Sequence, residues 1–289
     1  MNSLLPSELE NLALALAAGA TMELYLTPKP GLVDLADSGA HPDLSVSLME
    51  QSIGIVGDYL DEIVLSLKSD EPFHRQKEVA LRAEQRLQEE LGTNTHKGFI
   101  FLSGMLLIAR RSAEASDEMA IRRSLSMISE TFFSSPEAKN TNGERVRKRF
   151  NAGGIVREAI DGYPSLFEEA LPAFRRAYEQ HACVTTASFA MMARLMQTVE
   201  DTTTLHRAGP EGLERVRQDG RILEGIIARG GDFLSFLQEV NRDYVRMNIT
   251  IGGVADVLGL AFGCLIASGE IPEQPMARLP DLANSLVAA

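Results

Sequence analysis

Apolar residues recur every three to four positions along most of the chain, which is the period of a helix that buries one face. This pattern predicts helices over residues 7–25, 44–68, 74–91, 96–112, 117–133, 153–160, 164–179, 182–199, 210–229, 232–247 and 252–268. Val, Ile and Thr rarely alternate with polar residues, so the sequence predicts no strand. The expected fold class is therefore all-α.

The chain shows no internal repeat, no low-complexity tract and no long linker. Motifs rich in polar residues occur in both halves, so we expect one compact multi-helix domain over 1–289, with the site between the halves 1–133 and 151–270. The connecting segment 134–150 carries a basic cluster of Arg145, Arg147, Lys148 and Arg149. Residues 271–289, with three prolines, are expected to form a peripheral tail.

Composition narrows the class of protein. With 289 residues, 45% of them hydrophobic, the chain can bury a sizeable core. Its net charge of −12 disfavours a nucleic-acid partner, which would require a basic face. We identify no signal peptide and no apolar run that would span a membrane, and the two cysteines form no disulfide framework. We therefore expect a cytoplasmic protein without a membrane partner, and we allow for a homodimer.

The stretch TPKPGLVDLADSGAHPDLS, residues 27–45, interrupts the helical pattern. Pro28 and Pro30 force an extended path around Lys29. A rigid loop of this kind could present Lys29 to phosphate and its acids to Mg²⁺. The alternative is a surface loop with capping Asp residues.

The stretch GTNTHKGFIF, residues 92–101, is not a phosphate-binding P-loop, because Lys precedes Gly and no strand comes before it. It predicts a helix that begins near residue 95. His96 and Lys97 lie in the first turn, where a cation opposes the helix dipole, and this is favourable if a phosphate binds there. The alternative is an ordinary helix capped by Thr93, Asn94 or Thr95.

Three further segments carry polar residues at predicted helix ends or within an apolar helix. NAGGIVREAIDGYP, residues 151–164, places Arg157 after a glycine pair, which an ordinary turn also explains. In EDTTTLHRAG, residues 200–209, Glu200 and Asp201 end an apolar helix, where negative charge is disfavoured and a cation would offset it. Capping of the next turn by Asp201 is the alternative there. In NITIGGVADVLGLAFG, residues 248–263, Asp256 interrupts an apolar helix, and either a metal or a salt bridge would explain it.

Together these segments supply acids, cations and histidines suited to the Mg²⁺-assisted handling of a phosphorylated ligand. In their order and spacing, TPKPGLVD, NTHKG, the GG…EA pair, EDT…HR and GGVAD resemble the triphosphoribosyl-dephospho-CoA synthase family, from about residue 10 to about 268. That family joins ATP to 3′-dephospho-CoA and releases adenine. The resemblance implies a transferase whose substrates are ATP and 3′-dephospho-CoA and whose cofactor is Mg²⁺.

The resemblance also implies site residues. The catalytic candidates are Asp34, His41, Asp43, Glu200 and Asp201. The candidates for binding substrate and phosphate are Lys29, Asn94, His96, Lys97, Arg157, Arg207, Gly252 and Gly253. The candidate Mg²⁺ ligands are Asp34, Asp43, Glu200, Asp201 and Asp256.

Four residues replace those of the family pattern: Thr203 stands for Asn, and Thr250, Ile251 and Val254 stand for Ser, Pro and Ser. In addition, the third motif reads GGIVREA where GGIRGEA is common, so its Arg is shifted. These changes leave the acceptor substrate open. Two alternative functions also stay open: a Mg²⁺-dependent hydrolase of a nucleotide or ADP-ribosyl compound, and a non-catalytic nucleotide- or CoA-binding partner protein.

Overall fold

A computed structural model describes residues 6–115, 117–134 and 152–271 of the chain. Within these ranges the regular elements are α1 (Pro6–Tyr25), α2 (Val46–Lys68), α3 (Phe73–Leu91), α4 (Lys97–Ser112), α5 (Glu118–Phe133), α7 (Gly154–Ile160), the π-helical η1 (Ser165–Ala170), α8 (Leu171–His181), α9 (Val184–Thr198), α10 (Thr202–Ala228), α11 (Phe233–Met247) and α12 (Gly252–Ala267). No strand occurs among the described residues, which confirms the all-α prediction. The basic cluster of residues 145–149 and the tail beyond residue 271 lie outside them.

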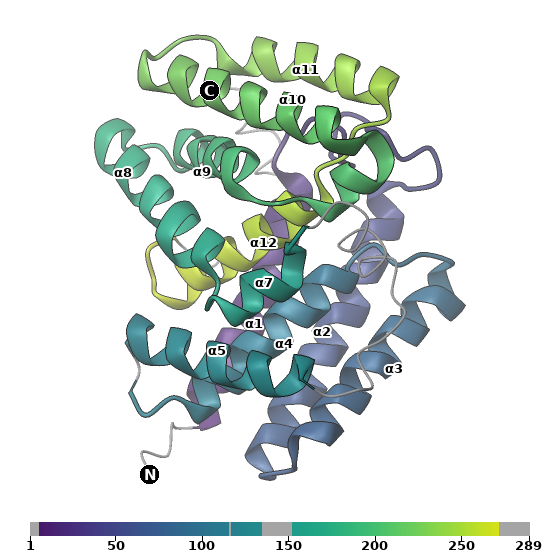
Figure 1. The fold of residues 1–289 in the computed structure, drawn as a ribbon, viewed down its shortest axis with the longest axis vertical. Helices are drawn as coiled ribbons and strands as arrows, with labels where there is room; N and C mark the ends of the chain where they lie inside the picture. The colour runs from purple at the N-terminus through teal and green to yellow at the C-terminus, as the bar shows by residue number, and fades with distance from the viewer. Residues whose placement is uncertain (1–5, 116, 135–151, 272–289) are drawn as a thin grey trace.

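Helix α12 lies in the middle of the molecule, with α2 to α5 on one side and α8 to α11 on the other (Figure 1). It packs along α1, and glycines at the crossing allow the two backbones to touch. A Cβ on Gly19 would lie 2.4 Å from the Gly259 carbonyl oxygen, and one on Gly263 would lie 2.8 Å from the Leu16 Cα. The first and last helices of the described part of the chain are therefore in contact at the centre of the fold.

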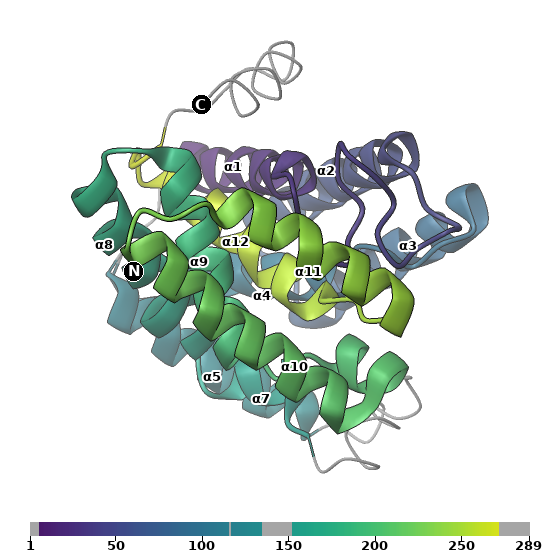
Figure 2. The same ribbon diagram turned by 90° about the horizontal axis from the view of Figure 1, so that it is seen from above.

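One hydrophobic cluster extends from Leu9 to Ile271, so both halves contribute to the same core. Its members include Tyr163, whose buried hydroxyl donates to the Leu102 carbonyl at 3.0 Å and links the second half to α4. Figure 2 shows α10 and α11 side by side on one face. None of the helices in the described part of the chain is both long and apolar enough to cross a membrane.

The helix bounds agree with the sequence prediction to within about three residues, with one clear exception. The helix predicted over residues 210–229 begins eight residues earlier, because α10 starts at Thr202. Asp201 caps this extra helical stretch by accepting from the Thr203 and Thr204 N–H groups. The helix then bends at Gly209, whose φ of 70° is readily available only to glycine.

Candidate functional site

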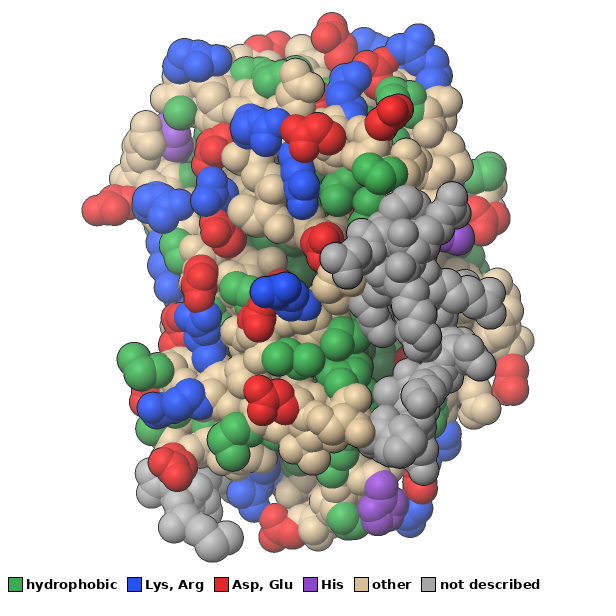
Figure 3. Space-filling view, viewed as in Figure 1, with side chains coloured by type: hydrophobic (Ala, Val, Ile, Leu, Met, Phe, Trp, Pro, Cys, Tyr) green, Lys and Arg blue, Asp and Glu red, His purple; other side chains and the backbone are tan. Residues whose placement is uncertain are grey.

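A cavity of about 1120 Å³ lies where the polar segments of both halves come together. Its lining includes residues of α1, of the loop between α1 and α2, of the start of α4, of α7, of the α9–α10 connection and of the start of α12. One part of it is apolar, where Phe101, Phe132 and Phe133 line it. Figure 3 shows hydrophobic side chains near the middle of this face, among interspersed acids and bases.

In the loop between α1 and α2, the predicted Lys29 and Asp34 are both buried and neither lines the cavity. The Lys29 Nζ donates to the carboxylate and to the backbone carbonyl of Glu23, at 2.5 Å each. The Asp34 carboxylate accepts from the backbone N–H groups of Lys29, Ala36 and Asp37. These two residues therefore shape the loop by contacts within the protein.

Glu23, on α1, lines the cavity and was missed by the sequence analysis. Burial raises its pKa, and the attraction of Lys29 opposes that shift. A usable signal was present, because Glu23 is the one acid in the apolar stretch from Leu12 to Leu26. A lone acid on an apolar helix requires a partner or a function.

His41 lines the cavity, but both of its ring nitrogens have protein partners. Arg207 donates to Nδ1 at 3.3 Å and also to the carbonyl of Ala40. Since a guanidinium can only donate, Nδ1 must be an acceptor, and the proton lies on Nε2, which is 2.7 Å from the Thr250 Oγ1. Burial and the charge of Arg207 lower the pKa of His41. His41 is thus held neutral in one tautomer.

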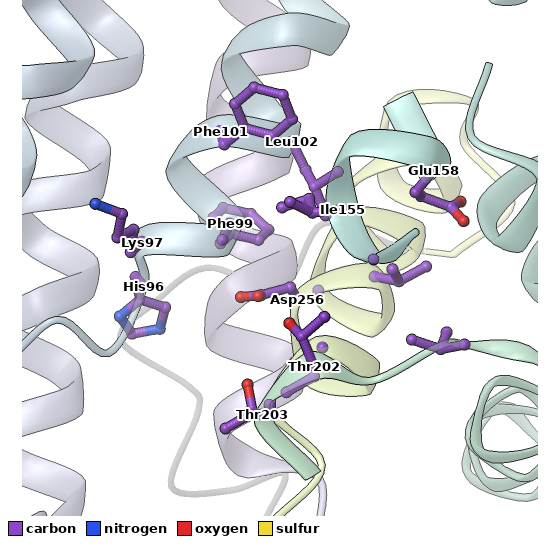
Figure 4. A pocket seen from close by; sticks show the side chains of 18 of the residues that line it. His96, Lys97, Phe99, Phe101, Leu102, Ile155, Glu158, Thr202, Thr203 and Asp256 are labelled. Atoms are coloured by element: carbon purple, nitrogen blue, oxygen red, sulfur yellow. The ribbon is translucent and has the colours of Figure 1, made fainter. Parts of the chain in front are cut away.

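His96 precedes α4 and is 6% exposed. Its Nδ1 lies 2.5 Å from the Ser52 Oγ on α2, and its ring packs edge-on against Phe99. Burial, assisted by the charge of Lys29, lowers the pKa of His96 to about 4. No described residue pairs with its Nε2, and the residue lines the cavity (Figure 4).

The N-terminus of α4 already holds a carboxylate of the protein. The Asp256 carboxylate, on α12, lies against Gly98, and the nearby Phe99 backbone N–H favours its charged form. Gly98 makes this approach possible, because a Cβ there would lie 1.9 Å from the Asp256 Oδ2. Burial raises the pKa of Asp256 well above its ordinary value, and the nearby charges of Asp201 and Glu23 add to the shift. The salt bridge considered for Asp256 does not occur with any described residue.

Figure 4 shows the Asp256 carboxylate pointing toward the side of the cavity where His96 lies. Thr202 and Thr203 approach the same carboxylate from the start of α10, with their hydroxyl oxygens turned toward it. Thr203 is one of the departures from the family pattern, and it lines the cavity, as does Thr250. Two of the four departures are therefore at the ligand-facing surface.

Glu200 and Asp201 hold helix N-termini in place. Asp201, which is 1% exposed, accepts from Thr203 and Thr204 at the start of α10 and from Val254 at the start of α12. Glu200 accepts from the N–H groups of Gly153 and Gly154, where α7 begins. α9 ends at Thr198 with Val199 as its C-cap, and these two acids lie in the connection that follows. The capping alternative for Asp201 is confirmed.

The structure thus separates the predicted site residues into two groups. Those that line the cavity are His41, Asp43, Asn94, His96, Lys97, Arg157, Glu200, Gly252, Gly253 and Asp256. Those that do not line it are Lys29, Asp34, Asp201 and Arg207. Of the cations on the lining, Lys97 pairs with Glu84 at 2.5 Å, and Arg157, whose side chain is 77% exposed, pairs with Asp161.

The described residues contain no group of three or more His, Cys, Asp or Glu side chains that could hold a metal ion. Of the five predicted Mg²⁺ ligands, Asp43, Glu200 and Asp256 line the cavity, and they come from three different segments. Asp34 and Asp201 accept backbone N–H groups instead. The part of the chain described therefore offers single carboxylates and no all-protein metal cage.

The sequence profile of the CitG family, described as ATP:dephospho-CoA triphosphoribosyl transferase, matches residues 9–273. The chain belongs to this family. It is also similar to proteins named Probable 2-(5''-triphosphoribosyl)-3'-dephosphocoenzyme-A synthase. The relative from Streptococcus equi subsp. zooepidemicus is 31% identical over 83% of this chain and 90% of its own length. The relative from Pseudomonas putida is 30% identical over 84% of this chain and 90% of its own length. The one from Salmonella gallinarum is 28% identical over 90% of this chain and 91% of its own length. No solved structure matches the chain.

Proposed function

We propose that the cavity binds ATP and 3′-dephospho-CoA together and is the site at which the triphosphoribosyl group is transferred. Membership of the triphosphoribosyl transferase family gives the class of reaction. The observation that supports the location is that all five motifs of the family resemblance contribute residues to this one cavity. Its volume of about 1120 Å³ is above the usual range for a single small ligand, as two nucleotide-sized substrates would require.

In this reaction the 2′-hydroxyl of dephospho-CoA attacks C1 of the ATP ribose. A C–O bond forms, the bond from C1 to adenine breaks, the hydroxyl loses its proton and the departing adenine gains one. The transition state resembles an oxocarbenium ion, as in the cleavage of a glycoside. Carboxylates on the cavity lining suit such positive charge, and Asp43 and Glu200 are candidates.

The triphosphate requires positive charge, and we place it at the more exposed part of the cavity. Lys97 and Arg157 line the cavity while their side chains are 47% and 77% exposed. Each pairs with an acid at the surface, so each could exchange a weak exposed ion pair for a phosphate contact. This arrangement keeps the polyphosphate away from the buried carboxylates.

The donor set fits Mg²⁺ bound together with the substrate. Mg²⁺ usually takes one or two carboxylates and completes its shell with phosphate oxygens and water. Asp43 and Glu200 line the cavity and would hold it, Glu200 through Oε1, since its Oε2 accepts the N–H groups of Gly153 and Gly154. The ion would supply charge neutralisation to the triphosphate. The five-residue ligand set, the cytoplasmic location and the homodimer stay predictions.

A product assay tests the function. Purified protein with ATP, Mg²⁺ and dephospho-CoA should release adenine, measured by chromatography, and form a product with the mass of triphosphoribosyl-dephospho-CoA. Omission of dephospho-CoA should stop adenine release, whereas a hydrolase would continue. Nucleotide binding without any turnover would support the non-catalytic alternative. Replacing dephospho-CoA by CoA tests the acceptor, which the departures at Thr203 and Thr250 leave open.

A further inference from the structure

The residue Ser52 belongs to none of the five motifs. Ser52 lies on α2 and is completely buried. Its hydroxyl contacts the Nδ1 of His96 at 2.5 Å and the Oγ1 of Thr95 at 3.1 Å. A buried hydroxyl aimed at one ring nitrogen fixes both the orientation and the protonation pattern of an imidazole. Ser52 therefore controls what the other nitrogen presents to the cavity.

Ser52 and Thr95 can together hold His96 in one of its two neutral forms. The Thr95 hydroxyl can donate to the Ser52 Oγ, and the Ser52 hydroxyl can donate to Nδ1, which lies 2.5 Å away. In that arrangement the proton of the neutral ring lies on Nε2, the nitrogen that has no partner among the described residues.

The surroundings oppose a positive charge on this ring. His96 is 6% exposed, and the buried ammonium of Lys29 is near enough to disfavour the imidazolium. A histidine that resists protonation is a poor proton acceptor at neutral pH, whereas its N–H remains a good hydrogen-bond donor. His96 is suited to donating a hydrogen bond and unsuited to taking a proton.

The neighbours of His96 also indicate which part of a nucleotide it meets. The carboxyl groups of Glu23 and Asp256 line the same cavity, and that of Asp256 lies against Gly98 at the α4 N-terminus. The cations Lys97 and Arg157 are largely exposed, while His96 is buried. Phosphates therefore find counter-charge at the exposed part of the cavity, and an uncharged group fits better beside His96.

We propose that Ser52 is a positioning residue that holds His96 with its proton on Nε2, and that this N–H donates a hydrogen bond to the nucleoside part of bound ATP. The proposal rests on the proposed function for the identity of the ligand. Adenine ring nitrogens and ribose oxygens are the uncharged acceptors that ATP offers. His41 cannot serve in the same way, because Thr250 and Arg207 occupy its nitrogens.

The first test reads the tautomer directly. In ¹⁵N-labelled protein the His96 ring, identified by the loss of its signals in His96→Gln, should carry its proton on Nε2. Ser52→Ala should convert it to a mixture of the two neutral forms, and Ser52→Thr should restore the single form. Ser66→Ala is the matched control, since Ser66 is a buried hydroxyl on the same helix that bonds Glu71 and Gln76. A ring that stays a single tautomer in Ser52→Ala overturns the proposal.

The second test identifies the ligand group by calorimetry with adenosine and with inorganic tripolyphosphate. Ser52→Ala should weaken adenosine binding about three- to tenfold, the range of one hydrogen bond, and leave tripolyphosphate binding unchanged. His96→Phe keeps the ring packing against Phe99 and should give the same result, which covers the case that Ser52→Ala does not fold. Unchanged adenosine binding, an equal loss for tripolyphosphate, or no adenosine binding by the wild type would each overturn the proposal.

Both tests are independent of turnover, so their failure differs from failure of the proposed function. A wild-type protein that releases no adenine would remove the transferase assignment and leave the tautomer and adenosine results interpretable. Conversely, a functional transferase in which Ser52→Ala behaves like Ser66→Ala would remove only the role of Ser52.

Discussion

Two polar segments contribute to the cavity and use their side chains in opposite ways. In the loop of residues 26–45 almost every polar group has a protein partner: Lys29 pairs with Glu23, Asp34 bonds three backbone N–H groups, and His41 lies between Thr250 and Arg207. At the start of α4, by contrast, one ring nitrogen of His96 has no partner among the described residues.

A sequence motif rich in polar residues therefore does not by itself identify the groups that contact a ligand. Polar side chains buried in a loop are first needed to satisfy that loop's own backbone. Residues 26–45 also bond to α11, where Asn241 donates to Asp37 and accepts from Gly31. Apart from Asp43, which lines the cavity, that loop is a scaffold, whereas the start of α4 presents a ring nitrogen of His96 that no described residue pairs with.

Removal of the buried Lys29–Glu23 pair should have the largest effect on stability. Lys29→Met leaves the Glu23 carboxylate buried without its cation, and we expect a loss of about 3–5 kcal/mol in the free energy of unfolding. Urea denaturation followed by circular dichroism measures it. Lys68→Met, which removes an exposed pair with Glu10, should cost less than about 1 kcal/mol. A similar small loss for Lys29→Met would show that the loop does not depend on this pair.

The next effect concerns the close approach at α4. Gly98→Ala would place a Cβ 1.9 Å from the Asp256 Oδ2, and we expect overpacking to destabilise the protein by about 2–3 kcal/mol. Gly54→Ala is the matched control, because that helical glycine has no atom within 4 Å of an added Cβ. It should stabilise by about 0.5–1 kcal/mol in the same urea experiment. Equal behaviour of the two variants would mean that Asp256 does not occupy the α4 N-terminus.

The third prediction compares the effects of substituting His96 and His41 on kcat/KM and on stability. His96→Gln should lower kcat/KM for adenine release about tenfold, equivalent to about 1.4 kcal/mol, because a positioned donor on the cavity lining is altered. His41→Gln should change kcat/KM less than about threefold and reduce stability by about 1 kcal/mol, because it breaks contacts internal to the protein. His74→Gln, at an exposed position on α3, is the control for both. A larger loss of kcat/KM in His41→Gln than in His96→Gln would instead place the functional histidine in the loop of residues 26–45.

The sequence predicted the fold well because helical periodicity is a local signal that extends over many residues. The bounds of α2, α3, α11 and α12 follow directly from it. The helical stretch of residues 202–208 was missed because a cap, Asp201, decides its existence, and the preceding acid was taken as a helix end. Boundaries that depend on one hydrogen bond are harder to predict than faces that depend on ten apolar residues.

The candidate site was predicted in its segments and only partly in its side chains. Motif spacing brought the right parts of the chain to one cavity, and ten of the predicted residues line it. Glu23 and Ser52 were missed, and Lys29 and Asp34 turned out to be buried partners, because pairing across helices depends on tertiary geometry that no local pattern encodes. Glu23 and Ser52, which pair with the motif residues Lys29 and His96, lie on helices outside the motifs.

The smallest expected effect tests whether the Asp256 carboxyl is held at an energetic disadvantage. Burial and the charges of Asp201 and Glu23 raise its pKa. The folded state therefore binds a proton that the unfolded state, with a pKa near 4, has already lost, so this group reduces stability as pH rises through that window. Asp256→Asn keeps an acceptor for the Phe99 N–H and removes the charge. The free energy of unfolding of this variant should equal that of the wild type near pH 4 and exceed it by about 1 kcal/mol at pH 8.

Urea unfolding between pH 4 and pH 8 measures this difference, with Asp61→Asn at an exposed position of α2 as the control that should show no such trend. A gap between Asp256→Asn and the wild type that does not widen with pH would contradict the raised pKa. It would also change the comparison between the two segments, because the α4 start would then hold a stably ionised carboxylate. If the stability difference widens with pH, the fold does not stabilise the ionised Asp256 carboxylate at the α4 start. Ionisable groups with raised pKa values of this kind are typical of ligand-binding sites.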